Sequence, residues 1–184
     1  MSDPRDELPL HLPAMRAFAI SLTRDVTSAD DLVQDTIVKA WSNFDKFTPD
    51  SNLRAWLFTI LRNTFYSDRR KRRREVPDPD GAHAARLLVK PTHDSRLAMN
   101  DFMKAFNELT PEHREVLVLV GASGFSYEDA AQMMGVAVGT VKSRANRARL
   151  RLCEMLGLRA GEDIVAEMDG ATRAVMSQSS TQAA

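Results

Sequence analysis

A run of basic side chains in the C-terminal third of the chain has the composition of a nucleic-acid contact. Residues 142–151 hold five Lys and Arg side chains and no Asp or Glu, and Ser and Asn stand among them. Cations neutralise phosphates, while Arg, Asn and Ser side chains hydrogen-bond to base edges in the major groove. The predicted contacts are Thr140, Lys142, Ser143, Arg144, Asn146, Arg147 and Arg151.

The residues before this run predict a helix-turn-helix. Ser126 opens a capping-box-like sequence in which Asp129 takes the place of the usual Glu or Gln. The small Ala131 allows a second helix to cross closely, and Gly135 permits the left-handed turn that ends the first helix. The second helix, which carries the cations, is predicted to begin at Thr140.

The inward side of this second helix is also marked in the sequence. Val141 is the expected anchor, and Ala145 is the expected packing contact because Arg144 stands where many such motifs have an apolar residue. A charge run taken alone is more often a solvated helix face, so the alternative is a helical hairpin whose arginines merely meet water. The cap, the glycine, the anchor and the acid-free helix together favour DNA binding.

A second cationic ridge is predicted within residues 54–75, which hold eight basic and two acidic side chains. Its members recur at three- or four-residue spacing opposite an apolar stripe, and Tyr66 is expected to be exposed among them. Such a ridge suits a single strand whose bases stack on the aromatic ring while its phosphates are neutralised. The alternative is a solubilising helix end, where cations favour the C-terminal dipole. The row comprises Arg62, Tyr66, Arg69, Arg70 and Arg73, with Asn63 beside it.

No constellation in the sequence indicates catalysis. The four His residues lack a metal-ligand spacing, Cys153 has no obvious base, and no glycine-rich phosphate loop is present. We therefore expect no enzyme activity, cofactor, metal or small-molecule substrate. The longest nearly apolar run, Val116 to Ala122, is far shorter than the roughly 20 residues of a membrane span. With no secretory signal at the N-terminus, we expect a cytoplasmic protein without membrane insertion.

Helical periodicity predicts the elements that position these side chains. Met15, Phe18, Ala19 and Leu22 form a first apolar stripe. A second stripe is predicted from Ser28, as N-cap, to Phe44, and a third from Leu53 to Phe65, with a loop at 45–52 between them. Thr110 and Pro111 predict another helix start. The aromatic residues expected in the core are Trp41, Trp56, Phe58 and Phe65.

These elements predict an all-α fold of two small helical domains joined by a flexible linker. The predicted boundaries are 8–75 and 95–157 for the domains, 76–94 for the linker with a short helix at 82–89, and 158–184 for a fraying tail. The whole chain of 184 residues carries 25 basic and 25 acidic side chains. Its zero net charge thus conceals two basic blocks in an acidic chain, an asymmetry that indicates charged partners.

The order of motifs resembles the extracytoplasmic-function sigma factors, the two-domain bacterial initiation factors of RNA polymerase. The residues that carry the resemblance are Asp31-Leu-Val-Gln-Asp35, Lys39-Ala-Trp41, Leu53-Arg-Ala-Trp-Leu57, Arg62-Asn63 and Asp68-Arg-Arg, then Thr110-Pro-Glu-His-Arg-Glu115 and the helix-turn-helix. The resemblance covers roughly residues 8–157. Within the family, the chain is most similar to the general-stress-response (EcfG-type) subgroup.

The resemblance implies a role for each segment. Asp31, Gln34, Asp35 and Lys39 match the segment that binds core RNA polymerase. The 45–52 loop and the following helix match the reader of the −10 promoter element, with Asn52, Arg62, Asn63, Tyr66, Arg69, Arg70 and Arg73 as its contacts. The helix from Thr140 matches the reader of the −35 element. Family members are also commonly held by an anti-sigma factor, so the resemblance implies that partner as well.

Two other functions compete with this interpretation. A sigma-like mimic would capture anti-sigma proteins without promoter activity, but both basic blocks are intact here and no receiver domain is present. A conventional operator-binding regulator would need only the helix-turn-helix. It would leave the segment from Asp31 to Trp41 and the first basic helix unexplained.

Overall fold

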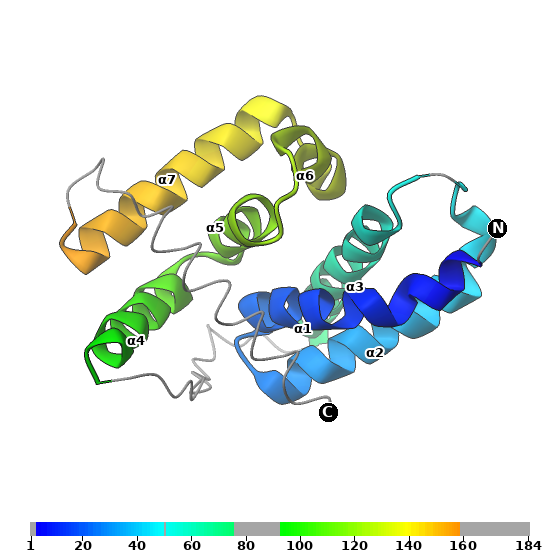
Figure 1. Cartoon of the computed structure of the whole chain (residues 1–184), viewed down its shortest axis with the longest axis horizontal. Coiled ribbons are helices and arrows are strands. Elements are labelled where there is room, and N and C mark those ends of the chain that lie inside the picture. Colours follow the sequence, from blue (N-terminus) through cyan, green and yellow to red (C-terminus); the bar gives the residue numbers. More distant parts are fainter. Residues whose placement is uncertain (1–2, 50, 76–92, 159–184) are drawn as a thin grey trace. The chain divides into compact units, whose positions relative to one another are not determined.

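The computed structural model describes residues 3–49, 51–75 and 93–158, and every regular element in these ranges is helical (Figure 1). This confirms the predicted all-α fold for the described residues. The chain divides into two compact units at residues 83 and 84. All but the last two residues of the predicted linker, and the tail beyond residue 158, lie outside the described residues.

The first unit is built from three long helices that lie side by side. A 3-10 turn, η1 (Pro4–Glu7), leads into α1 (Leu8–Thr23), followed by α2 (Val26–Ser42), the 3-10 turn η2 (Phe44–Lys46) and α3 (Leu53–Glu75). Each of the three long helices contacts the other two (Figure 1). The predicted stripe of α1 is buried along its whole length, which confirms it as core. At its centre the ring of Phe18 stacks on that of Phe58 with centroids 5.1 Å apart.

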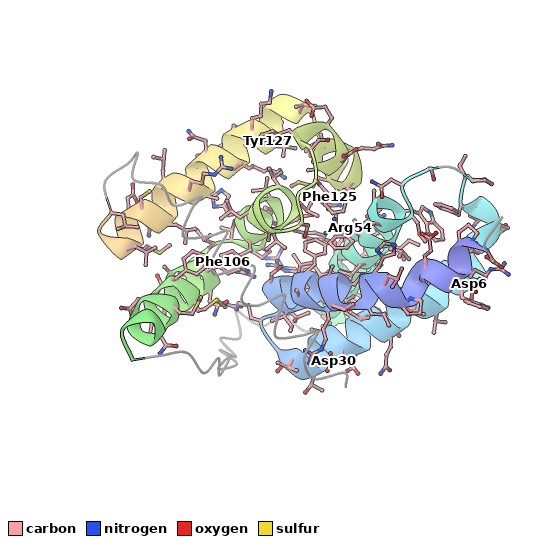
Figure 2. All side chains as sticks on the ribbon, viewed as in Figure 1. Asp6, Asp30, Arg54, Phe106, Phe125 and Tyr127 are labelled. Atoms are coloured by element: carbon pink, nitrogen blue, oxygen red, sulfur yellow. The ribbon has the colours of Figure 1, made fainter. Side chains whose placement is uncertain are left out.

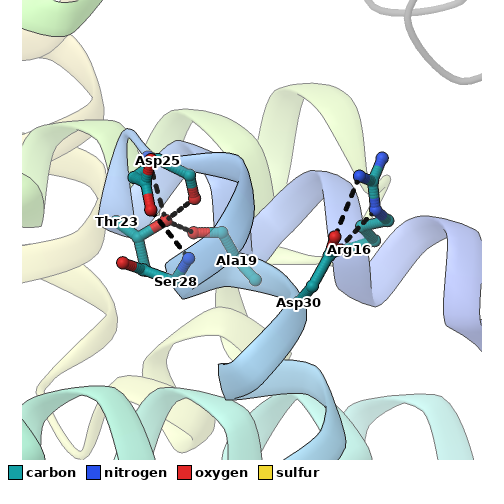
Figure 3. A network of polar contacts seen from close by, with 6 residues as sticks. All are labelled: Arg16, Ala19, Thr23, Asp25, Ser28 and Asp30. Atoms are coloured by element: carbon teal, nitrogen blue, oxygen red, sulfur yellow. Dashed lines mark hydrogen bonds and ion pairs between the residues drawn. The ribbon is translucent and has the colours of Figure 1, made fainter. Parts of the chain in front are cut away.

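The start of α2 corrects the predicted N-cap. The N-cap lies three residues earlier than expected, at Asp25 rather than Ser28, since the Asp25 carboxylate accepts the Ser28 amide at 2.7 Å (Figure 3). Ser28 instead occupies the third helical position, whose amide needs such an acceptor. Arg16 and Asp30 join α1 to α2 through an ion pair of 2.6 Å. Both of its side chains are well exposed, so the pair stabilises the unit by at most about 1 kcal/mol.

The aromatic residues that follow α2 correct a second prediction. Trp41 was expected in the core, yet it is 57% exposed. The predicted 45–52 loop instead turns Phe47 inward, where Phe44, Phe47 and Trp56 form a cluster with centroids 5.2–5.5 Å apart. Trp41 is not part of this cluster. Arg5 of η1 covers the Trp41 and Phe44 rings at 5.3 and 5.0 Å.

The second unit holds the remaining helices. They are α4 (His93–Glu108), α5 (Pro111–Val116), the π-helical turn η3 (Leu117–Ala122), α6 (Tyr127–Met134) and α7 (Val138–Leu156). Thr110 caps α5 as predicted, its hydroxyl accepting the His113 amide at 3.3 Å. Arg114 is buried and donates a hydrogen bond to the carbonyl oxygen of Leu109. This bond gives a partner to a backbone carbonyl at the junction of α4 and α5. The long α7 packs against α4, α5 and α6, so it is the central helix of the unit.

Within the parts of the chain that the structure describes, no helix combines the length and apolar character that crossing a membrane requires.

Candidate nucleic-acid interface

The helix-turn-helix has the predicted construction, with one boundary moved. The Ser126 hydroxyl accepts the Asp129 amide at 2.9 Å, and Gly135 ends α6 with a φ of 65°, the left-handed conformation that glycine adopts without strain. The buried Ala131 belongs to the inward side of α6. However, α7 begins at Val138 rather than at Thr140, and its N-cap, Ala137, provides no side-chain hydrogen bond. The turn is therefore shorter than predicted.

One side of α7 is buried and apolar and the other is polar, as the sequence predicted. Val141, Ala145, Ala148 and Leu152 are fully buried, which confirms the anchor and the packing contact. None of the seven predicted DNA contacts on this helix is buried. Lys142, Asn146, Arg147 and Arg151 are exposed, while Thr140, Ser143 and Arg144 are half-buried. The helix thus presents a polar face that carries cations and no acid before Glu154.

Hydrogen bonds within α7 distinguish its cations from one another. Arg147 donates from Nη2 to the Ser143 hydroxyl at 3.2 Å, which holds its guanidinium over the middle of the exposed face. Arg151 is paired with Glu154 at 3.0 Å, so its charge is partly neutralised. Arg147 is consequently the better placed of the two to contact a base edge.

Tyr127 contacts two of the α7 cations, which the sequence did not predict. It is the first residue of α6 and lies alongside α7 (Figure 2), where both Nη atoms of Arg149 approach its hydroxyl at 3.4 and 3.5 Å. The ammonium of Lys142 lies 5.7 Å from its ring centroid. Tyr127 therefore holds two cations of α7, two helical turns apart, against the preceding helix. Nothing local marks this role, because Arg149 lies 22 residues further along the chain.

His113 is a second neighbour of the α7 cations. Burial lowers its pKa below the ordinary value, and the positive charge of Arg147 lowers it further; Glu112 opposes this, and Arg144 adds to it. The imidazole is therefore neutral at pH 7. It adds no charge to the α7 surface, although it can still form hydrogen bonds there.

The first unit contains a groove between the end of α2, η2 and α3. Its volume is about 410 Å³, within the range of small-ligand pockets. Trp56 and Ile60 supply an apolar and aromatic wall, and the other lining side chains are basic, amide or hydroxyl groups without any acid. The lining residues are Lys39, Asn43, Lys46, Trp56, Ile60, Asn63, Thr64 and Ser67. Of the residues predicted to contact single-stranded DNA, only Asn63 lines this groove.

Three of the predicted single-strand contacts have local partners. Asn52 caps α3, accepting the Ala55 amide at 3.0 Å. Tyr66 was expected to be exposed, but it is half-buried beneath Arg62, whose guanidinium lies 4.7 Å from the ring centroid, and its edge meets Phe65 at 5.1 Å. The ring is therefore less exposed than predicted, because Arg62 lies over it.

The remaining cations of α3 lie beyond the groove, toward the end of the helix. Arg70 and Arg73 are exposed and Arg69 is half-buried. They extend the cationic ridge toward the end of α3, as the spacing predicted.

The exposed face of α2 carries the acidic residues assigned to polymerase. Asp31, Gln34 and Asp35 are exposed, and the same face continues into Val38, which is 65% exposed, and Trp41. Val38 was not among the predicted contacts, and Trp41 was predicted to lie in the core. The face therefore combines carboxylates with an apolar patch, as protein-binding surfaces do. Lys39 departs from this face and lines the groove instead.

The helix-turn-helix and the acid-free groove define a two-part DNA-binding transcription factor, and known families match both parts. Residues 10–75 match the family described as Sigma-70 region 2, and residues 99–152 match Sigma-70, region 4. The ECF RNA polymerase sigma factor EcfG of Rhodopseudomonas palustris is 54% identical over 159 residues, which cover 86% of this chain and 88% of the relative.

Two further relatives are also sigma factors. The sigma factor RpoE of Bartonella quintana, solved in complex with the anti-sigma factor NepR, is 54% identical with a TM-score of 0.74, and the match covers 87% of this chain and 100% of that one. The sigma factor CnrH of Cupriavidus metallidurans is 34% identical over 164 residues, covering 78% of each chain. The chain belongs to the extracytoplasmic-function sigma factors. It is a transcription initiation factor of RNA polymerase and not an enzyme.

Proposed function

We propose that the chain directs core RNA polymerase to promoters by reading two DNA elements in different states. The outer face of α7 reads duplex −35 DNA in the major groove, where all four base pairs are distinguishable. The groove of the first unit binds an unpaired base of the −10 element. The observation that carries the proposal is that α7 buries its apolar side and leaves its predicted base contacts unburied.

In vitro transcription with core polymerase and a promoter library tests this proposal. The expected result is initiation from a defined subset of promoters only when the protein is added. Binding to an anti-sigma protein without any promoter-specific initiation would instead make the chain a sigma-like mimic. Binding to an operator without help from polymerase would indicate a conventional regulator.

The −35 contact gives the first quantitative prediction. Arg147→Ala is expected to weaken binding to a −35 duplex by about 1–3 kcal/mol, because the guanidinium held by Ser143 loses a base-edge contact. Fluorescence anisotropy with the preferred duplex and with duplexes altered at single positions measures the effect. The loss should disappear on the duplex altered at the contacted base. An equal loss of affinity on every duplex would indicate that Arg147 contacts a phosphate instead of a base.

The −10 assignment rests on the chemistry of the groove. Trp56 offers a ring for stacking, and the exposed Asn63 offers an amide to a base edge. A base enters such a groove only after it leaves the duplex stack, which costs a few kcal/mol. Bound polymerase would supply the interactions that offset this cost. The Asn52 cap fixes the start of α3, and through it the position of Trp56 four residues later.

The exposed face of α2 is the proposed contact with polymerase. Asp35→Lys is expected to weaken binding to core polymerase at least ten-fold, or about 1.4 kcal/mol, since it reverses a charge at an exposed position of the proposed docking face. Competition against a labelled sigma factor for core enzyme measures it. Circular dichroism should be unchanged because Asp35 is exposed.

A matched control for this change lies in the second unit. Asp101→Lys makes the same charge change at another exposed helical position and should leave the competition unaltered. If the Asp35→Lys protein formed holoenzyme as well as the wild type does, the proposal that α2 binds polymerase would be wrong.

We also propose that an anti-sigma protein of the NepR kind holds the chain in the cytoplasm until stress releases it. The support is the 54% identity to a sigma factor solved with NepR and to an EcfG sigma factor. Addition of such an anti-sigma protein to the transcription assay should abolish initiation in a concentration-dependent manner. Undiminished transcription at a large excess of it would oppose this control.

A further inference from the structure

Lys39 lies on the flank of α2 that faces α3. The inward side of α2 is marked by the buried Thr36 and Ala40, and the outward side by Asp35 and Val38. The Nζ atom of Lys39 crosses to α3, where it donates to the Oγ1 atom of Thr64 at 3.2 Å across 25 residues of sequence. Since Thr64 is buried, this contact directs the ammonium into the groove and away from the carboxylates of α2.

A second ammonium stands in the same groove. Lys46 of η2 donates to the Asn43 Oδ1 atom at 2.6 Å, and both lysines are exposed. None of the eight lining residues is acidic, and neither lysine forms an ion pair with a carboxylate of the described residues. The groove therefore carries two positive charges without an internal counter-charge. An anionic ligand is the partner that this arrangement lacks.

We propose that Lys39 and Lys46 bind backbone phosphates of the DNA strand whose base occupies the groove. This assignment rests on the proposed −10 function of the groove. A lysine ammonium has three donors, and Thr64 uses one of those of Lys39, so two stay available for phosphate oxygens. Thr64 acts as a positioning residue because it holds the Lys39 ammonium beside the Trp56 wall. Lys39 is thus a DNA contact and not a polymerase contact.

The groove chemistry favours a nucleic-acid strand over an acidic protein segment. An aromatic wall, the Asn63 amide and two ammonium groups offer a nucleotide stacking, base-edge hydrogen bonds and phosphate neutralisation at one place. A carboxylate side chain of polymerase would use only the ammonium groups. The two partners also differ in salt dependence, since a phosphate contact releases counterions condensed on DNA.

The test compares Lys39→Ala with the wild type as full-length holoenzyme on a fork-junction probe with a single-stranded −10 element. Loss of one phosphate contact should lower the salt slope by about 0.7, which corresponds to roughly five-fold weaker binding at 0.1 M salt. Core-polymerase competition should be unchanged. Lys39→Arg, which keeps the charge, should retain most of the slope. Lys104→Ala removes an exposed lysine of the second unit and should change neither measurement.

Asn63→Ala separates failure of this inference from failure of the −10 proposal. If Asn63→Ala weakens probe binding with an unchanged salt slope while Lys39→Ala does nothing, the groove binds a base and the lysine assignment is overturned. If neither substitution affects the probe, the groove does not bind DNA and both proposals fail. Weakened core-polymerase competition by Lys39→Ala, with an unaltered slope, would make Lys39 a polymerase contact and also overturn the inference.

Discussion

Replacing Phe18 by alanine is expected to unfold the first unit while the second unit stays folded. The Phe18 ring is fully buried between helices and stacks on Phe58, so its removal leaves a large cavity at the centre of the unit. Truncations of this kind cost about 3–5 kcal/mol. A unit of about 70 residues has a total stability on the order of 5 kcal/mol. Little or no net stability would therefore remain.

Urea denaturation followed by circular dichroism measures this effect. The wild type should unfold in one or two transitions, and the variant should lose the helical signal of α1–α3 already in buffer. Binding to an isolated −35 duplex should persist, because α4–α7 have a core of their own. Leu10→Ala is the matched control, since Leu10 is on the same helix but 76% exposed. A wild-type midpoint for Phe18→Ala would refute the proposed role of this contact.

Replacing Ala145 by glutamate is expected to have the largest effect in the second unit. Ala145 is fully buried on the inward side of α7. Overpacking costs about 1–3 kcal/mol, and an unpaired buried carboxylate adds about 3–5 kcal/mol. The sum exceeds what a unit of this size withstands. Loss of −35 binding should therefore accompany loss of the folded unit.

The adjacent position supplies the control for charge. Asn146→Glu introduces the same carboxylate one residue later on the exposed face of α7. The added carboxylate should repel phosphates and abolish −35 binding. The free energy of unfolding should stay within about 0.5 kcal/mol of the wild-type value. If the Ala145→Glu protein also unfolded at the wild-type temperature, Ala145 would not be buried against the other helices of the unit.

Much of the fold follows from local sequence signals. The α1 stripe, the Thr110 cap, the Ser126 cap and the Gly135 turn are each specified by residues within a few positions of one another. Hydrogen bonds of this range depend only on helix geometry, which the sequence period also reports. The inward Ala145 was predicted on the same basis. These features were therefore accessible without knowledge of the neighbouring helices.

Predictions differ from the structure where two nearby residues could both cap a helix, or where a neighbouring element decides how exposed a side chain is. Asp25 and Ser28 are both good caps, and the helix starts at the earlier one. Trp41 belongs to an apolar stripe, but it is exposed, whereas Phe47 of the predicted loop is buried and contacts Trp56. Tyr66 is less exposed than predicted, because Arg62 lies over its ring. Periodicity identifies a helix face, and only packing decides what covers it.

The sequence by itself determined the helices, the two basic blocks and the outer face of α7, because each depends on residues within a few turns of chain. The tertiary structure alone decided the groove, the approach of Lys39 to Thr64 and that of Tyr127 to Arg149. These contacts join residues more than twenty positions apart, and their geometry depends on how neighbouring helices are rotated and spaced. A periodic pattern places Lys39 on the edge of a face. The packing of α2 on α3 turns it into the groove.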